Sequence, residues 1–248
     1  MRTQLFAGVA AWLLHAATAM AAAGAVVNYE VNGQPYEGYF VSPAPDAPLV
    51  LLLHDWDGLT DYEVKRADML AQMGYAVFAA DLFGAGVRPT KVEDRRQHTG
   101  ELYQDRAKMR ALMNGALQAA ASKGGDLSNA LAMGYCFGGA AVLELARSGA
   151  DLKGFASFHG GLKTPPGQDY GNVKGEILVL HGTADTAISM DEFAGLAKEL
   201  EQARVAHEMI SYSGAPHAFT VFGTERYRED ADRKSWERFS RFLEQHLQ

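Results

Sequence analysis

The chain has 248 residues and a formal net charge of −7, and 48% of its residues are apolar. This length and composition fit one folded domain with a large core, and they exclude a disordered chain. The acidic balance and the lack of a basic stripe exclude nucleic acid as an expected partner.

The N-terminus has the pattern of a secretory signal peptide. A positive Arg2 precedes an apolar stretch at residues 5–14, and small-residue cleavage sites follow up to residue 23. We expect residues 1–23 to be removed, leaving a secreted or periplasmic domain at residues 24–248 without stable membrane association. The alternative is an uncleaved membrane anchor, because the apolar stretch 5–27 approaches the length that spans a bilayer.

The chain then opens with a predicted hairpin. Residues 26–31 and 36–41 have strand character, and Asn32 and Gly33 between them are typical of a tight turn. Later apolar runs predict further strands at residues 49–53, 76–80, 129–133, 154–158, 177–180 and 206–212. The continuous apolar run at 49–53 is typical of a strand that is buried on both faces.

Helical patterns alternate with these strands. They are expected at residues 62–73, 92–122, 140–147, 190–203 and 228–247, with a break near Gly100. Strands alternating with helices predict an α/β fold: a mostly parallel central sheet with helices on both faces and an N-terminal antiparallel hairpin. Ligands bind at the carboxyl ends of strands in such sheets, where polar clusters occur in this chain.

The only cysteine lies in the sequence Gly-Tyr-Cys-Phe-Gly-Gly, residues 134–139, between a predicted strand and a predicted helix. Strand, Gly-x-nucleophile-x-Gly and helix together form the nucleophile elbow of α/β hydrolases, with Cys136 in the usual place of serine. The alternative is that Cys136 is a small buried hydrophobic residue. With one cysteine, no intrachain disulfide can form.

A nucleophilic thiol needs a base and a group that orients the base. In α/β hydrolases the chain order is nucleophile, acid, histidine, and Cys136 is followed by Asp185 and His217 on loops after strands. Other residues at strand ends compete with these two. The histidines could line the site but are expected to have packing or loop roles: His54, His159 and His181. The aspartates compete with Asp185, and the last of them is expected to cap a turn: Asp55, Asp57 and Asp81.

The oxyanion of an acyl-transfer intermediate needs backbone donors. We expect these to be the N–H groups of Phe137, which follows the nucleophile, and of Trp56, on the loop after strand 49–53. The sequence has no ligand pair at helical spacing and no Cys/His cluster of zinc type, so no metal site is expected.

Six blocks together resemble the dienelactone hydrolase family. They are residues 54–58 (HDWDG), 80–84 (ADLFG), 134–139 (GYCFGG), 158–161 (FHGG), 180–185 (LHGTAD) and 217–219 (HAF). The resemblance implies an α/β-hydrolase fold, a Cys/His/Asp triad, no cofactor, and hydrolysis of a small carboxylic ester or lactone through an acyl-thiol.

The resemblance also assigns a carboxylate that meets the resting thiol. The family usually has glutamate there, whereas this chain has Asp55, which is one methylene shorter. Well-studied members hold the substrate carboxylate with an arginine four residues after the catalytic histidine, where this chain has Val221. Arginines in the helical region could take its place: Arg95, Arg96 or Arg106.

Aromatic and histidine side chains near the strand ends are candidate pocket residues. They are Trp56, Phe83, Tyr135, Phe158, His159 and Phe219, and core packing is the alternative role for each. Two other functions stay open for the whole chain. It could be a non-catalytic envelope binding protein on a hydrolase fold, or a thiol-redox protein that acts through Cys136.

Overall fold

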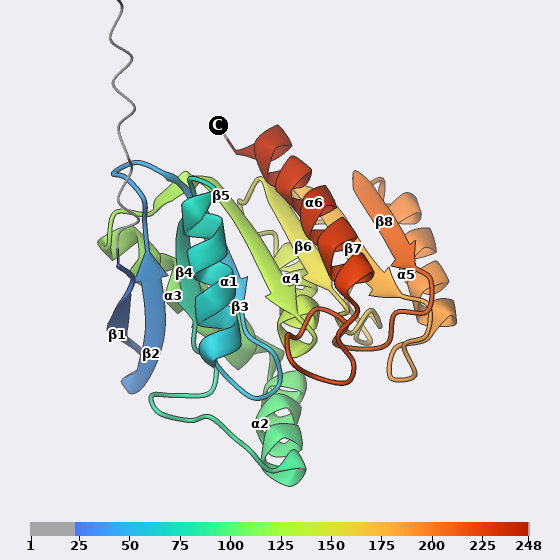
Figure 1. The fold of residues 1–248 in the computed structure, drawn as a ribbon, viewed down its shortest axis with the longest axis horizontal. Coiled ribbons are helices and arrows are strands. Elements are labelled where there is room, and N and C mark those ends of the chain that lie inside the picture. Colours follow the sequence, from blue (N-terminus) through green and yellow to red (C-terminus); the bar gives the residue numbers. More distant parts are fainter. Residues whose placement is uncertain (1–22, 248) are drawn as a thin grey trace, which may run out of the picture.

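An eight-stranded sheet forms the centre of the protein (Figure 1). The computed structural model describes residues 23–247, so the expected signal peptide lies outside the described residues except for its last position. The strand order is β1-β2-β4-β3-β5-β6-β7-β8. The strands are β1 (Ala25–Val31), β2 (Gln34–Val41), β3 (Pro48–Leu53), β4 (Ala76–Ala80), β5 (Asp126–Tyr135), β6 (Gly154–Phe158), β7 (Glu176–Gly182) and β8 (His207–Tyr212).

The sheet is mixed, as the sequence predicted. β3 to β8 pair in parallel, whereas β1 and β2 form an antiparallel hairpin whose second strand pairs with β4. The hairpin turn places Asn32 and Gly33 at φ angles of +52° and +74°. These left-handed angles are the reason for the Asn-Gly pair, because a tight hairpin turn needs positive φ at both central residues.

Helices cover both faces of the sheet. They are α1 (Asp61–Gln72), α2 (Val92–Gln104), α3 (Arg106–Ser122), α4 (Phe137–Arg147), α5 (Met190–Ala203) and α6 (Glu229–His246). In Figure 1, α1 and α6 lie in front of the sheet, α3, α4 and α5 lie behind it, and α2 extends past the carboxyl ends of the strands. Among the described residues, no helix is long and apolar enough to cross a bilayer.

The alternating side chains of β3 enter both layers of the core. Leu49, Leu51 and Leu53 pack on the side of α3 and α4, whereas Val50 and Leu52 pack on the side of α1 and α6. All five are fully buried. A strand sandwiched in this way has no polar face, which explains its continuous apolar sequence.

The break in the long helical region lies at Asp105, so the predicted break near Gly100 is wrong. Gly100 lies inside α2, because one glycine weakens a helix by only about 1 kcal/mol and does not stop it. The Asp105 side chain accepts a hydrogen bond from the Lys108 backbone N–H (2.8 Å) and so begins α3. The chain turns there, which leaves α2 beside the carboxyl ends of the strands.

Candidate active site

Cys136 lies on a sharp turn between β5 and α4, with φ +49° and ψ −110°. A non-glycine residue rarely adopts this backbone conformation, and such strain is held only where neighbouring packing imposes it. A Cβ atom on Gly138 would lie 2.3 Å from the carbonyl oxygen of Leu53, and one on Gly134 would lie 2.4 Å from the Gly138 backbone. Glycine at these two positions therefore allows the strand and helix to meet and the thiol to project.

His217 lies within hydrogen-bonding distance of both Cys136 and Asp185. The Cys136 Sγ atom is 3.0 Å from Nε2 of His217, and Nδ1 of His217 is 2.7 Å from Oδ2 of Asp185. A proton on Nδ1 that is donated to Asp185 leaves the Nε2 lone pair directed at the thiol. This is the geometry that a nucleophile, its base and an orienting acid require.

The loop after β7 holds the Asp185 carboxylate in a fixed orientation. Its Oδ1 atom accepts hydrogen bonds from the backbone N–H groups of Ala187 (2.8 Å) and Ile188 (2.9 Å). Burial opposes the charge, but the hydrogen bond with His217 and these backbone donors outweigh it and lower the pKa of Asp185. Asp185 is therefore ionised and able to stabilise an imidazolium.

The resting thiol is protonated. Burial raises the pKa of Cys136 well above its ordinary value, and the charge of Asp55 and its hydrogen bond with the thiol raise it further. Burial also raises the pKa of Asp55 to about 6, with the charge of Asp57 adding to the effect. The hydrogen bond between Asp55 and the thiol means that aspartate, one methylene shorter than glutamate, is long enough to contact Cys136.

Asp55 also occupies one of the expected oxyanion donors. Its Oδ1 atom accepts the Trp56 backbone N–H at 2.5 Å. The Phe137 N–H, at the start of α4, interacts with the Cys136 sulfur and favours its thiolate. The Phe137 N–H therefore lies at the thiol, whereas the Trp56 N–H, from a residue that lines the same cavity, is occupied by Asp55.

A second buried carboxylate, Glu63 of α1, supports this loop from behind. Its Oε1 accepts the Asp55 backbone N–H (3.2 Å), and its Oε2 accepts the Thr60 backbone N–H and hydroxyl (2.8 Å each). Burial raises the pKa of Glu63 to about 8 despite these donors. The Asp55–Trp56 loop is therefore fixed to the first turn of α1.

A buried polar network holds the loop that carries His217. Arg66 of α1 donates to the Thr220 carbonyl oxygen (2.9 Å) and pairs with Asp232 of α6. The Thr220 hydroxyl lies 2.7 Å from the Tyr62 hydroxyl and 2.8 Å from Nε2 of His159. These contacts fix the loop that carries His217 to α1, and through Arg66 and Asp232 to α6.

A cavity of about 370 Å³ opens above the thiol. Its lining residues come from α2, the elbow and the loops after β3, β6, β7 and β8: Asp55, Trp56, Arg96, Thr99, Tyr103, Cys136, Phe137, Gly161, Ala187, Ile188, His217, Ala218 and Arg226. Its size fits a small ester or lactone.

Of the six candidate pocket residues, Trp56 lines this cavity and the other five do not. Tyr135, Phe158 and Phe219 pack in the core on the side of α1 and α6. Phe83 packs against the rings of Phe137 and His98. Neighbouring side chains on a strand point to opposite faces, so a place beside the nucleophile in sequence directs Tyr135 away from the cavity.

His159 lies behind His217 instead of in the cavity. It is fully buried, and its ring centroid is 5.4 Å from that of His217. Burial and the neighbouring His217 lower the pKa of His159, so its ring is neutral. His159 contacts Thr220 and His217, so it helps to position the loop that carries His217.

Several cavity residues could not be predicted from the sequence. Thr99 and Tyr103 lie on α2, the helix whose end was expected elsewhere. Arg226 lies nine positions after His217 in an irregular loop, where no periodicity indicates its direction. Arg96 is one of the three candidate arginines for a substrate carboxylate, and it lines the cavity. Arg95 pairs instead with Asp57 (3.6 Å).

The competing strand-end residues have structural contacts. Nε2 of His54 accepts the Leu82 N–H (3.1 Å), and His181 is buried against the Phe193 ring. Oδ1 of Asp81 accepts the backbone N–H groups of Phe83 (2.9 Å) and Gly84 (3.1 Å), as a turn-capping residue does. Within residues 23–247, no three His, Cys, Asp or Glu side chains are grouped as metal ligands.

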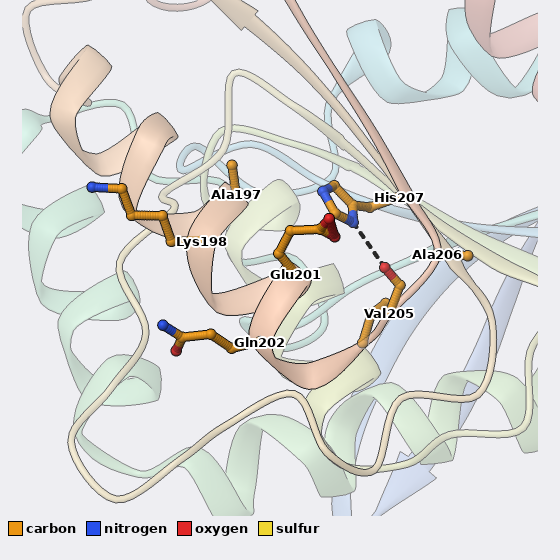
Figure 2. Close-up of a pocket in the computed structure, with 7 residues that line it drawn as sticks. All are labelled: Ala197, Lys198, Glu201, Gln202, Val205, Ala206 and His207. Carbon is orange, nitrogen blue, oxygen red and sulfur yellow. Dashed lines mark hydrogen bonds between the residues drawn. The ribbon is translucent and has the colours of Figure 1, made fainter.

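Another hollow lies where α5 ends and β8 begins, and Figure 2 shows the residues that line it. It is lined by Ala197, Lys198, Glu201, Gln202, Val205, Ala206 and His207. Nδ1 of His207 is 2.8 Å from the Val205 carbonyl oxygen, and no thiol or hydroxyl nucleophile lines the hollow. The candidate active site is therefore the cavity at Cys136.

Comparisons with known proteins agree with this fold. Protein usf of Aquifex pyrophilus is 26% identical over 79% of this chain and 87% of its own. A solved structure titled m3DLH is 30% identical and matches 92% of this chain and 100% of its own with a TM-score of 0.86. A dienelactone hydrolase-like promiscuous phosphotriesterase from metagenomic libraries is 29% identical over the same shares, with a TM-score of 0.85. The family model for dienelactone hydrolases matches residues 36–247, and the chain belongs to the dienelactone hydrolase family.

Proposed function

We propose that this member of the dienelactone hydrolase family, a carboxylic ester or lactone hydrolase, cleaves its substrate through an acyl-thiol on Cys136. The observation that carries the proposal is the unbroken contact from the Cys136 thiol to His217 (3.0 Å) and on to Asp185 (2.7 Å) at the floor of a cavity. A buried thiol with a raised pKa is a weak nucleophile alone, so attack needs the base.

Acylation begins when a substrate carbonyl enters the cavity and displaces Asp55 from the Trp56 N–H. Nε2 of His217 takes the thiol proton while sulfur bonds to the carbonyl carbon. The oxyanion that forms accepts hydrogen bonds from the Trp56 and Phe137 N–H groups. The intermediate then collapses, the carbon–oxygen bond to the leaving group breaks, and His217 gives its proton to the departing oxygen.

Deacylation repeats these steps with water. His217 takes a proton from water as the water oxygen bonds to the thioester carbon, and the same two backbone donors hold the oxyanion. The carbon–sulfur bond breaks, the carboxylic acid leaves, and the proton returns to sulfur. Asp185 stays ionised and stabilises the His217 imidazolium in both halves of the reaction.

Two arginines give the cavity a positive wall. Arg96 of α2 and Arg226 of the His217 loop line it, and neither forms an ion pair within residues 23–247. Free guanidinium groups bind carboxylates. We expect them to orient small substrates that carry an acidic group near the scissile ester.

Turnover of p-nitrophenyl butyrate and a panel of small lactones by the purified protein tests the proposal. We expect Cys136→Ala and His217→Ala to lose at least about 10³-fold in kcat, because the nucleophile and its base act together. Asp185→Asn should also lose activity, through the wrong His217 tautomer. Full turnover by Cys136→Ala would contradict the proposal. A binding protein would turn over no ester, and a redox protein would consume peroxide without ester turnover.

A second activity is favoured by the similarity to the promiscuous phosphotriesterase. In this reaction the Cys136 thiol, deprotonated by His217, attacks phosphorus as the aryloxide leaves, while the same backbone donors hold the phosphoryl oxygen. Water then cleaves the phosphorus–sulfur bond, and a proton returns to sulfur. Paraoxon hydrolysis by the wild type, lost in Cys136→Ala, would support this. A wild-type protein that turns over esters but releases no p-nitrophenol from paraoxon would contradict it.

We also propose that the protein acts outside the cytoplasm after removal of residues 1–23. The support is the sequence alone: a positive start, an apolar stretch and small-residue cleavage sites. N-terminal sequencing of the protein from an extracytoplasmic fraction should begin near residue 24. Intact residues 1–23 in a membrane fraction would favour the anchor.

A further inference from the structure

A second cavity of about 460 Å³ adjoins the catalytic cavity. The two share Tyr103, Gly161 and Ile188 as walls, and the second extends toward the start of α3 and the loop after β6. The catalytic cavity alone accommodates a small ester. The adjoining space can therefore hold a part of the substrate that lies away from the scissile bond.

Positive charge exceeds negative charge at the base of this second cavity. The fully buried Glu144 of α4 faces three arginines, with nitrogen–oxygen distances of 2.6 Å to Arg110, 2.8 Å to Arg147 and 3.5 Å to Arg106. One carboxylate cannot neutralise three guanidinium groups. The cluster therefore has an uncompensated positive charge in a partly desolvated place, where charges interact strongly.

The three arginines differ in what they can still bind. Arg147 is saturated: it donates to Gln168, Tyr170 and Glu144, each at 2.8 Å. Arg106 lines the cavity, its Nε donates to the Tyr103 carbonyl oxygen (2.9 Å), and its contact with Glu144 is the longest of the three. Its terminal nitrogens therefore retain donors for a ligand.

The other charged residues of the cavity add to this preference. Lys163 lines it, is exposed, and forms no ion pair within residues 23–247. Glu192 is the one acidic residue that lines it, and its Oε2 atom accepts the Ser189 N–H (2.8 Å) at the start of α5. Burial, opposed by Glu144 but assisted by Arg147 and Arg110, lowers the pKa of Arg106, as expected for a cation without enough counter-charge.

We propose that the second cavity is a binding subsite for the terminal acidic group, a carboxylate or a phosphate, of an elongated ester. The scissile carbonyl lies at Cys136, the chain passes Tyr103 and Ile188, and the far acidic group binds Arg106 and Lys163. This inference rests on the proposed esterase function and names the substrate class: half-esters of long dicarboxylic acids and their phosphate-ended equivalents.

The test uses p-nitrophenyl half-esters of dicarboxylic acids of increasing length, each paired with the same chain capped by a methyl ester. A phosphonate-ended series shows which acid is preferred. Above the length that reaches Arg106, we expect wild-type kcat/KM for the acid-ended ester to exceed that of its capped partner by about tenfold, as one charge-assisted contact provides. Arg106→Gln should reduce that ratio to near one, and Lys163→Gln should reduce it partly.

Two matched variants separate this subsite from other effects. Arg96→Gln, in the catalytic cavity, should alter short and long substrates alike. Lys198→Gln, in the hollow of Figure 2, should leave every ratio unchanged. A ratio near one at all lengths in the wild type, or an unchanged ratio in Arg106→Gln, would overturn the inference while ester turnover still supports the proposed function.

Binding without catalysis gives an independent measurement. Calorimetry with the free long dicarboxylate on Cys136→Ala should show binding that Arg106→Gln weakens about tenfold. Melting curves for both variants verify that they are folded. Absence of turnover in the wild type would contradict the proposed function, whereas absence of Arg106-dependent binding would overturn the subsite.

Discussion

The thiol of Cys136 is protonated in the absence of substrate. Burial and the Asp55 carboxylate both raise its pKa, and Asp55 also occupies the Trp56 N–H. One carboxylate therefore suppresses the thiolate and blocks an oxyanion donor at the same time. In the proposed reaction, a substrate that displaces Asp55 removes both restraints at once.

Asp55→Asn should make the thiol more reactive toward a neutral alkylating agent. Removal of the adjacent negative charge lowers the pKa of Cys136, so more thiolate is present at neutral pH. We expect iodoacetamide labelling to accelerate about tenfold. Labelling at several pH values, followed by mass spectrometry, measures the rate.

Asp57→Asn is the control for this variant. Asp57 raises the pKa of Asp55 and pairs with Arg95 on the surface. Its removal leaves Asp55 more fully ionised beside the thiol, so labelling should not accelerate. Equal acceleration in both variants, or none in Asp55→Asn, would contradict the role given to Asp55.

At the scale of elements, the elbow depends on close contact between α4 and β3. Gly138→Ala would place a Cβ atom 2.3 Å from the Leu53 carbonyl oxygen, so the helix must move. We expect a loss of about 1–3 kcal/mol in the free energy of unfolding and a fall in activity, because Cys136 moves too. Urea unfolding measures the first effect and ester turnover the second.

Gly100→Ala is its matched control. Gly100 lies inside α2, and no atom lies within 4 Å of the position that a Cβ would occupy. Alanine should therefore stabilise α2 by about 0.5–1 kcal/mol. The steric account of the elbow fails if the two alanine variants change stability equally.

The position of the His217 loop depends on the contacts that Tyr62 and Arg66 of α1 make with Thr220. Thr220→Val keeps the shape of the side chain but removes the hydroxyl that bonds the Tyr62 hydroxyl and Nε2 of His159. We expect kcat to fall about tenfold with little change in KM, since small misplacement of a base slows proton transfer. Thr220→Ser should retain most of the activity, and equal loss in both variants would contradict a role for the hydroxyl.

The sequence indicated those elements that rest on local physical rules. The hairpin, the parallel strands and the elbow follow from turn chemistry, apolar runs and glycine placement. The order of Cys136, Asp185 and His217 identified the three residues that the structure brings together. These features are local, or follow from the edge at which parallel strands end.

The rest depends on tertiary contacts. The predicted break near Gly100 is wrong, because one interior glycine does not end the helix, whereas the Asp105 side chain caps the start of α3. The chain turns at Asp105, and this turn places α2. Arg226 and Tyr103 reach the cavity from an irregular loop and a repositioned helix, which no periodicity encodes. Tyr135 and Phe158 were predicted at the pocket, but the alternation of side chains along their strands directs them into the core.

At the scale of the whole molecule, Glu63 should contribute stability that is lost as the pH rises. Glu63 has its pKa raised to about 8 from an ordinary value of 4.5, so the folded state retains a proton that the unfolded chain has lost between these pH values. The contribution of Glu63 is therefore greatest at the acidic end of this range and declines through it. Asp55, with a pKa of about 6, contributes in the same direction at lower pH.

Glu63→Gln should flatten this decline. Urea midpoints at about pH 5 and about pH 9 measure it, and the wild type should lose more stability between them than the variant does. Glutamine keeps an acceptor for Thr60 but cannot ionise. An identical decline in both proteins would show that Glu63 is not the group responsible.

The acyl-thiol on Cys136 is the central claim, and rapid-quench mass spectrometry tests it most directly. Wild-type protein mixed with excess p-nitrophenyl butyrate and quenched in acid should carry one butyryl group. That group should lie on the peptide that contains Cys136 and should be released by neutral hydroxylamine, as a thioester is. A butyryl group on another residue, or full turnover with Cys136 never acylated, would contradict the account.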